Sequence, residues 1–240
     1  MSIANEITRL QTAKANLKTA IMAKGVEVAD TDTIDTYASK VEAIESGGID
    51  LISYIESPPT MSADLGEITE DMVFHLERAM SIANMFNRVP FGCSKLTLYI
   101  SNKCTTFFRA IRLGGDCALK EIEIIGDTSK VTTYEDAFSS QFNLERITGV
   151  LDFSSATIIG AFVNLCSKLQ YFQPKENTIK VSISFSSSPN LTDESIDAII
   201  NGLADLTGAT AQTLTFHADV KAKLTDNQIA TITSKNWTLA

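Results

Sequence analysis

The chain has few of the residue types that carry most catalytic and metal-binding chemistry. Its 240 residues include two histidines, four cysteines and one tryptophan. His75 and His217 lie far apart in the sequence, and no two cysteines form a Cys-x-x-Cys pair, so neither a histidine-based catalytic group nor a zinc module is indicated. The motifs of serine hydrolases, P-loop proteins, dinucleotide-binding folds and zinc proteases are also missing. We therefore expect no catalysis, no cofactor and no bound metal.

Basic runs and long apolar runs are missing as well. The formal net charge is -9 and no run of Lys and Arg exceeds a pair, so we expect no nucleic-acid binding. No stretch approaches the roughly 18 apolar residues of a membrane span, so we expect no membrane insertion. The first residues lack the basic and apolar regions of a secretory signal. These observations predict a protein made and folded in a cytoplasm.

An internal repeat is the main feature that is present. The same four residues occur at Cys93–Leu96 and at Cys166–Leu169. Leucines at 96, 119, 144, 169 and 191 are separated by 23, 25, 25 and 22 residues. That period is the length of one strand plus a return segment, and such units must stack to bury their apolar faces. Cys93 and Cys166 are interpreted as small buried hydrophobes in this repeat, with a disulfide as the alternative.

Part of the repeat resembles a known family. The pattern is similar to the leucine-rich repeats of the BspA type, found in bacterial surface proteins and bacteriophage tail proteins, over roughly residues 81–190. The residues that carry the resemblance are Ala137-Phe138, Leu144–Ile147, Leu151–Ser154, Ala161-Phe162, Cys166–Leu169 and Tyr171-Phe172. The resemblance implies a fold more than a function, because repeats are scaffolds on which binding sites are placed.

The amino-terminal segment has the pattern of two amphipathic helices. Residues 3–24 carry apolar residues at alternating steps of four and three, which is a heptad seam, and Gly25 ends the helix. A second helix is predicted from residue 34 to residue 44. The apolar positions of the two helices are Ile3, Ile7, Leu10, Leu17, Ile21, Ile34, Tyr37, Val41 and Ile44.

Two interpretations of this segment are open. One is a hairpin that caps the repeat, and the other is a module for oligomerisation and attachment. We favour the second because Gly47-Gly48 reads as a flexible junction. The residues at 7–21, 24–26, 34–38 and 40–41 also resemble the amino-terminal module of phage tail-fibre and baseplate proteins. That resemblance implies the attachment end of a virion protein.

These patterns together predict an α+β chain. An N-terminal helical hairpin or coiled-coil module (1–48) precedes a linker and N-terminal cap (49–80), which includes a strand over 50–55 and a helix over 70–80. A short leucine-rich-repeat solenoid (81–190) and an α/β C-terminal cap (191–240) follow. In the C-terminal cap, Thr192 and Thr225 are predicted to begin helices, and 213–217 and 237–239 to form strands.

The predicted function is that of a non-enzymatic phage virion protein of the tail-fibre, baseplate or receptor-binding type. Its helices would attach to other virion proteins as a homotrimer, and the outward sheet face would bind a host cell-surface glycan or protein. Candidate binding residues are Tyr99, Glu121, Glu123, Arg146, Tyr171 and Gln173. The alternatives are a bacterial surface adhesion or protein-interaction repeat protein and a phage head fibre or decoration protein.

Overall fold

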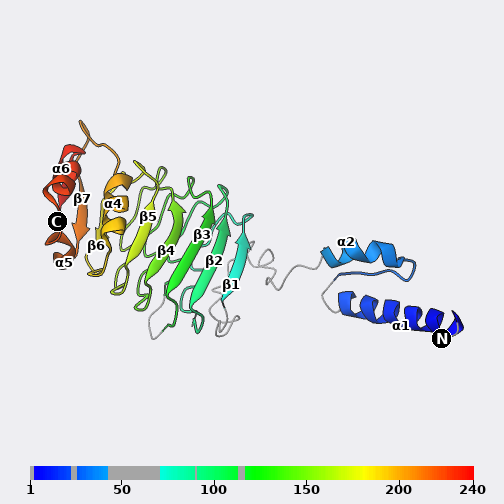
Figure 1. Cartoon of the computed structure of the whole chain (residues 1–240). Helices are drawn as coiled ribbons and strands as arrows, with labels where there is room; N and C mark the ends of the chain where they lie inside the picture. The colour runs from blue at the N-terminus through cyan, green and yellow to red at the C-terminus, as the bar shows by residue number, and fades with distance from the viewer. Residues whose placement is uncertain (1–2, 23–25, 43–70, 90, 113–116) are drawn as a thin grey trace. The chain divides into compact units, whose positions relative to one another are not determined.

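The computed structural model describes residues 3–22, 26–42, 71–89, 91–112 and 117–240. The chain divides into two units, Met1–Ile49 and Asp50–Ala240, here called the N-terminal unit and the sheet unit (Figure 1). No helix among the described residues is both long enough and apolar enough to cross a membrane.

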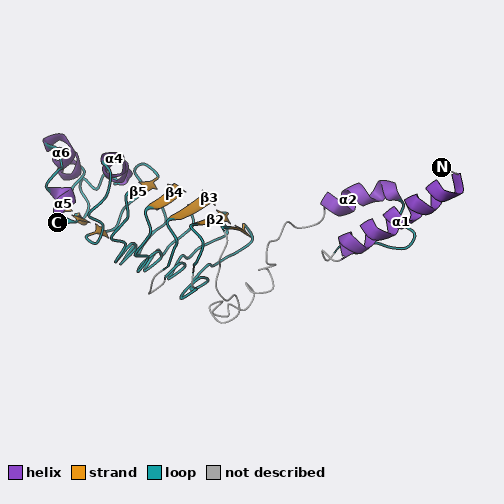
Figure 2. Cartoon of the chain, turned by 60° about the horizontal axis from the view of Figure 1, so that its bottom comes forward, coloured by secondary structure: helices purple, strands orange, loops and turns teal. Residues whose placement is uncertain are grey.

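The N-terminal unit consists of helix α1 (Ile3–Met22), a 3-10 turn η1 (Ile34–Thr36) and helix α2 (Tyr37–Glu42). An extended segment that begins at Val26 connects α1 to η1 (Figure 2). Among the described residues of this unit, the core consists of three buried side chains, Ile21, Val28 and Tyr37, with Val26 packed against them. Lys18 forms an ion pair with Asp30 across the connection. The second helix begins with a 3-10 turn, and α2 follows it directly. Its predicted end at residue 44 lies outside the described residues.

The predicted coiled-coil module is wrong. In a helical hairpin or coiled coil formed within the chain, the second helix would bury the apolar positions of α1, yet Ile7 is 51% exposed and Leu10 is 50% exposed. Within the described part of this unit, only the end of α1 is covered, through Ile21. The heptad spacing therefore produces an apolar stripe on α1 that the chain leaves open to solvent.

The sheet unit contains five parallel strands that lie side by side in sequence order (Figure 1). They are β1 (Met72–Leu76), β2 (Lys95–Ile100), β3 (Glu121–Gly126), β4 (Arg146–Leu151) and β5 (Tyr171–Pro174). Leu96 of β2 pairs with Met72 on one side and with Ile122 on the other. Ile147 continues that row, and Phe172 ends it.

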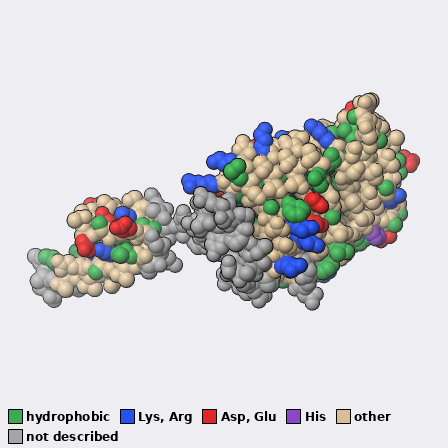
Figure 3. Space-filling model, turned by 180° about the vertical axis from the view of Figure 1, so that it is seen from behind, with side chains coloured by type: hydrophobic (Ala, Val, Ile, Leu, Met, Phe, Trp, Pro, Cys, Tyr) green, Lys and Arg blue, Asp and Glu red, His purple; other side chains and the backbone are tan. Residues whose placement is uncertain are grey.

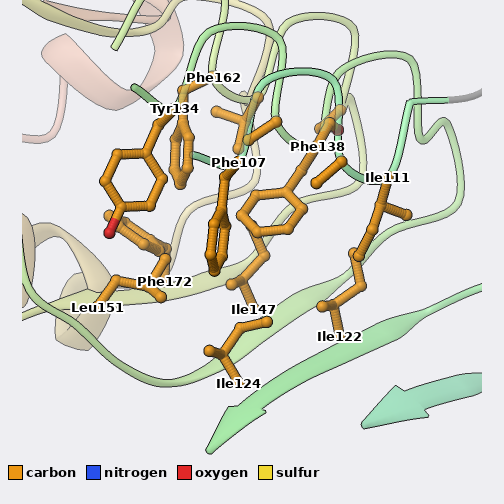
Figure 4. Packing of buried hydrophobic residues seen from close by; sticks show 14 of the residues in the cluster. Phe107, Ile111, Ile122, Ile124, Tyr134, Phe138, Ile147, Leu151, Phe162 and Phe172 are labelled. Atoms are coloured by element: carbon orange, nitrogen blue, oxygen red, sulfur yellow. The ribbon is translucent and has the colours of Figure 1, made fainter. Parts of the chain in front are cut away.

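The core lies between this sheet and the return segments that join its strands. Figure 2 shows the strands along one side of the unit and the return segments along the other. Alternate strand residues such as Ile122 and Ile124 point inward, and rings from the return segments, including Phe107 and Phe138, meet them (Figure 4). Tyr134 is fully buried there and its hydroxyl donates to the Asp152 carbonyl oxygen at 3.1 Å. Neighbouring rings contact edge to face, as in Phe138 against Phe162 at 5.3 Å.

The predicted fold class is wrong. The described chain is mostly α/β-like, built on the parallel five-stranded sheet and a second parallel sheet of three strands, and it contains neither a helical coiled-coil hairpin nor a clear solenoid. The spacing that suggested a leucine-rich-repeat solenoid is the spacing of parallel strands. Residues 72–76 form a strand instead of the predicted helix, because Phe74 and Leu76 alternate inward while Val73 and His75 point outward. The strand predicted over 50–55 lies outside the described residues.

The two identical tetrapeptides do not occupy equivalent places. Leu119 and Leu144 are buried two residues before their strands, and strand pairing aligns Cys93 with them. Leu96 lies instead inside β2, opposite Ile122. Leu169 does precede β5 as Leu144 precedes β4. The tetrapeptide at 93–96 is therefore displaced by three residues relative to that at 166–169.

The C-terminal part contains the helices and strands that the sequence predicts. A three-stranded parallel sheet forms from β6 (Ile183–Phe185), β7 (Gln212–Phe216) and β8 (Trp237–Leu239), with helices α4 (Asp193–Gly202), α5 (Ala218–Lys221) and α6 (Asp226–Ser234). Thr192 accepts the Ser195 amide as the N-cap of α4. Thr225 and Gln228 form a capping box at α6. The helices and strands predicted here are confirmed.

All four cysteines are buried free thiols, which confirms the interpretation of Cys93 and Cys166. Burial raises the pKa of Cys93 and of Cys104 to about 11 and that of Cys166 to about 12. Burial also raises the pKa of Cys117.

Two glycines permit the close approach of neighbouring strands. Gly126 has φ +119° and Gly149 has φ +86°, and a Cβ on either would lie within 2 Å of a carbonyl oxygen of the preceding strand. The register between β4 and β5 shifts between Ile147 and Leu151, the stretch that contains Gly149. This shift marks a β-bulge.

We expect Gly126→Ala and Gly149→Ala each to lower the free energy of unfolding by about 3 kcal/mol or more, because left-handed backbone strain adds to overlap with the backbone. Gly208 is the matched control: its φ is +82° but nothing lies within 4 Å of its added Cβ. Gly208→Ala should cost about 1 kcal/mol from backbone strain alone. Urea denaturation measures all three variants, and equal losses would contradict the overlap argument.

Candidate functional site

The outward side of the five-stranded sheet brings together polar and aromatic side chains from successive strands. Because strand side chains alternate between faces, the register sets these groups in rows across the sheet. We call them the outer-face array, defined as His75, Lys95, Thr97, Tyr99, Glu121, Glu123, Arg146, Thr148, Tyr171 and Gln173.

Lys95 links the charged part of the array. Its ammonium lies 3.1 Å from a Glu121 carboxylate oxygen and 2.9 Å from one of Glu123. The hydrogen bonds that the Lys95 ammonium donates to the carboxylates of Glu123 and Glu121 raise the pKa of Lys95, and the same ammonium lowers the pKa of Glu123. Thr97 donates to Glu123 at 3.1 Å and Thr148 donates to Glu121 at 3.2 Å. Both carboxylates are therefore held in place from two sides.

Arg146 and Tyr171 form the second part of the array. The guanidinium carbon of Arg146 lies 4.4 Å from the centre of the Tyr171 ring, a cation–π contact between paired residues of β4 and β5. The Tyr171 hydroxyl donates to the Gln173 side-chain oxygen at 2.8 Å. One face of the tyrosine is thus covered while its hydroxyl is oriented.

His75 and Tyr99 form the third part. These residues pair across β1 and β2, and their rings stack with centres 4.6 Å apart and planes inclined by 10°. His75 Nδ1 lies 3.1 Å from Glu77. The stack covers one face of each ring, so a ligand above the sheet would meet edges and polar atoms more than open ring faces.

The charged and aromatic groups of this array are suited to contacts with a ligand. Lys95 and Arg146 balance the charges of Glu121 and Glu123, and each group is engaged by neighbours before a ligand arrives. Among the described residues, no group of three or more His, Cys, Asp or Glu side chains could hold a metal ion. Preorganised Tyr and Arg side chains are the types that dominate protein interfaces.

The six predicted binding residues all lie on this one face. Tyr99, Glu121, Glu123, Tyr171 and Gln173 are half-buried and Arg146 is exposed. Sequence reasoning missed Lys95, which holds both glutamates, and placed His75 in a capping segment. The alternation of 72–76 was the signal that could have placed His75 on the sheet.

The predicted attachment residues divide into two sets. Ile7, Leu10 and Ile34 line an apolar groove of about 370 Å³ together with Gln11 and Lys14. Leu17 and Val41 are also exposed, whereas Ile21 and Tyr37 are buried in the core of the N-terminal unit and are not available to a partner. Ile3 lies in α1, and Ile44 lies outside the described residues.

Comparisons of the chain with protein-family models, with curated proteins and with solved structures found no match.

Lys95→Met should raise the pKa of Glu123, because the ammonium that stabilises its ionised form is removed. Because the pKa of Glu123 is lower in the folded than in the unfolded chain, its ionised form stabilises the fold at pH values above the ordinary pKa of a glutamate. That stabilisation is lost as the pH falls through the pKa of Glu123 in the folded chain. The variant should therefore be less stable than the wild type at neutral pH, and this difference in stability should be smaller at acid pH. NMR titration measures the pKa, with Lys120→Met, which removes a lysine paired with Glu145, as the control. An unchanged Glu123 pKa would contradict the network.

Proposed function

We propose that the chain is a non-enzymatic virion protein of the phage tail-fibre, baseplate or receptor-binding type. The N-terminal unit attaches to the particle and the sheet unit binds a glycan or protein on the host surface. The observation that carries this proposal is the outer-face array, which joins Tyr99, Tyr171 and Arg146 on one accessible face of the sheet.

The array suits repeated, moderate-affinity binding. Its aromatic rings and charged groups are already fixed by neighbours, so little side-chain freedom is lost when a partner is bound. The partner would contact ring edges, hydroxyl groups and the Lys95–glutamate network. Several copies of the chain on one particle would multiply such contacts through valency.

The exposed apolar surface of the N-terminal unit supports the proposal that this unit attaches to the particle. The three buried side chains found in the described part of this unit are a small core for a folded unit. Ile7, Leu10 and Leu17 extend an exposed stripe along α1, and Ile34 continues it on η1. We assign this stripe to contacts between copies of the chain, in a homotrimer that also docks on other virion proteins.

Replacing Tyr99 and Tyr171 together by Ala should weaken binding to host cells by roughly tenfold or more, since interface tyrosines commonly contribute over 1 kcal/mol each. The measurement is sedimentation of labelled protein with intact cells from a panel of candidate bacterial hosts. The control replaces Phe142 and Ile158, which are exposed elsewhere on the sheet unit, by Ala. Equal binding by both double variants would remove the outer-face array as the binding surface.

Replacing Ile7, Leu10 and Leu17 together by Asp should convert a trimer to a monomer, because three charges would be buried at the contact between copies. Light scattering measures the mass, and circular dichroism checks the sheet unit. Thr12, Asn16 and Thr19, which helical spacing places on the other side of α1, are replaced by Asp as the control. A monomeric wild type, or loss of the whole fold in the first variant, would contradict the assignment and favour a capping role.

A further inference from the structure

Three exposed cations occupy the same position in three consecutive turns at the carboxyl edge of the five-stranded sheet. The segments 76–79, 101–104 and 128–131 each form a turn closed by a backbone hydrogen bond from the fourth residue to the first, of 2.9, 3.1 and 3.0 Å. The third residue of each turn is a cation. We call Arg78, Lys103 and Lys130 the turn cations.

Backbone hydrogen bonds just beyond the turns place the turn cations in a column. The Thr105 amide donates to the Met80 carbonyl oxygen at 2.9 Å, and the Thr132 amide donates to that of Thr105 at 2.9 Å. Each turn is thus displaced from the next by one strand spacing, about 4.8 Å. The fourth turn has Ser155 at this position, and the Lys180 ammonium lies 3.4 Å from the neighbouring Ser154 carbonyl oxygen.

The turn cations have no anionic partner among the described residues, although the chain as a whole is acidic. Carboxylates close to the turns at this edge of the sheet are engaged by other groups. Glu77 contacts His75, Asp127 accepts the Ser129 amide at 2.8 Å, and Asp152 pairs with Lys175 at 2.8 Å. Figure 3 shows Lys and Arg side chains projecting from the edge toward which the strands of Figure 1 point.

We propose that this column binds a linear polyanionic glycan, in which phosphate groups recur along a flexible polyol or sugar chain. Three like charges at regular spacing match a polymer with repeated anions better than a single small anion. Thr105 and Thr132 lie beside the column, and their hydroxyls donate to backbone carbonyls at 3.1 Å. Single-stranded nucleic acid is usually held by aromatic stacking, and these neighbours offer no ring. This inference does not depend on the virion proposal.

The test measures binding of the full chain to a fluorescent glycerol-phosphate oligomer by anisotropy at several salt concentrations. One variant combines Arg78→Gln, Lys103→Gln and Lys130→Gln. Each phosphate contact contributes about 0.7 to the slope of log affinity against log salt for flexible single strands. The triple variant should therefore lower the slope by about 2 and weaken binding at least tenfold at low salt. Trp237 fluorescence and the thermal midpoint should stay unchanged, because the replaced side chains are exposed.

The matched control combines Lys120→Gln, Lys168→Gln and Lys221→Gln, which removes the same charge elsewhere on the sheet unit. This control variant should keep most of the wild-type affinity for the glycerol-phosphate oligomer and most of the wild-type salt slope. Equal losses in both triple variants, or no binding by the wild type at low salt, would overturn the proposal. A thymidine oligonucleotide with the same number of phosphates is the second probe, and tighter binding to it than to the glycerol-phosphate oligomer would assign the column to nucleic acid instead.

Discussion

Backbone hydrogen bonds between neighbouring strands, and between neighbouring return segments, fix the register of the whole sheet unit. The Glu145 amide donates to the Lys120 carbonyl oxygen before the strands begin, and the Thr132 amide donates to that of Thr105 after they end. Every side-chain row follows from this alignment. The inward rows form the aromatic core, the outward rows form the array around Lys95, and the turns after the strands align the turn cations.

Much of the sheet unit could be predicted from local patterns. The alternation in 96–100 identified β2 and its outward Tyr99, and the same logic placed Arg146 and Tyr171 on that face. Threonines before acidic residues predicted both helix starts near the C-terminus, since an N-cap is a local interaction. These features depend on neighbours within a few residues, and the sequence specifies them directly.

Features that depend on partners distant in the sequence were predicted less well. Heptad spacing in α1 predicts an apolar stripe, but it does not say whether a second helix covers it, and Ile7 and Leu10 are open to solvent. Repeated tetrapeptides suggested an alignment that strand pairing rejects, because Cys93 rather than Leu96 takes the buried place before its strand. The bonds from Lys95 to two glutamates on the next strand become visible only once the register is known.

The four buried thiols have a consequence for the settings in which the protein can work. Thiolate is the reactive form of cysteine, and burial raises the pKa of all four thiols, to about 11 for Cys93 and Cys104 and to about 12 for Cys166. They therefore resist both oxidants and disulfide exchange. The same thiols should persist in a reducing cell interior and in aerated medium, so no disulfide has to form or break when the surroundings change from one to the other.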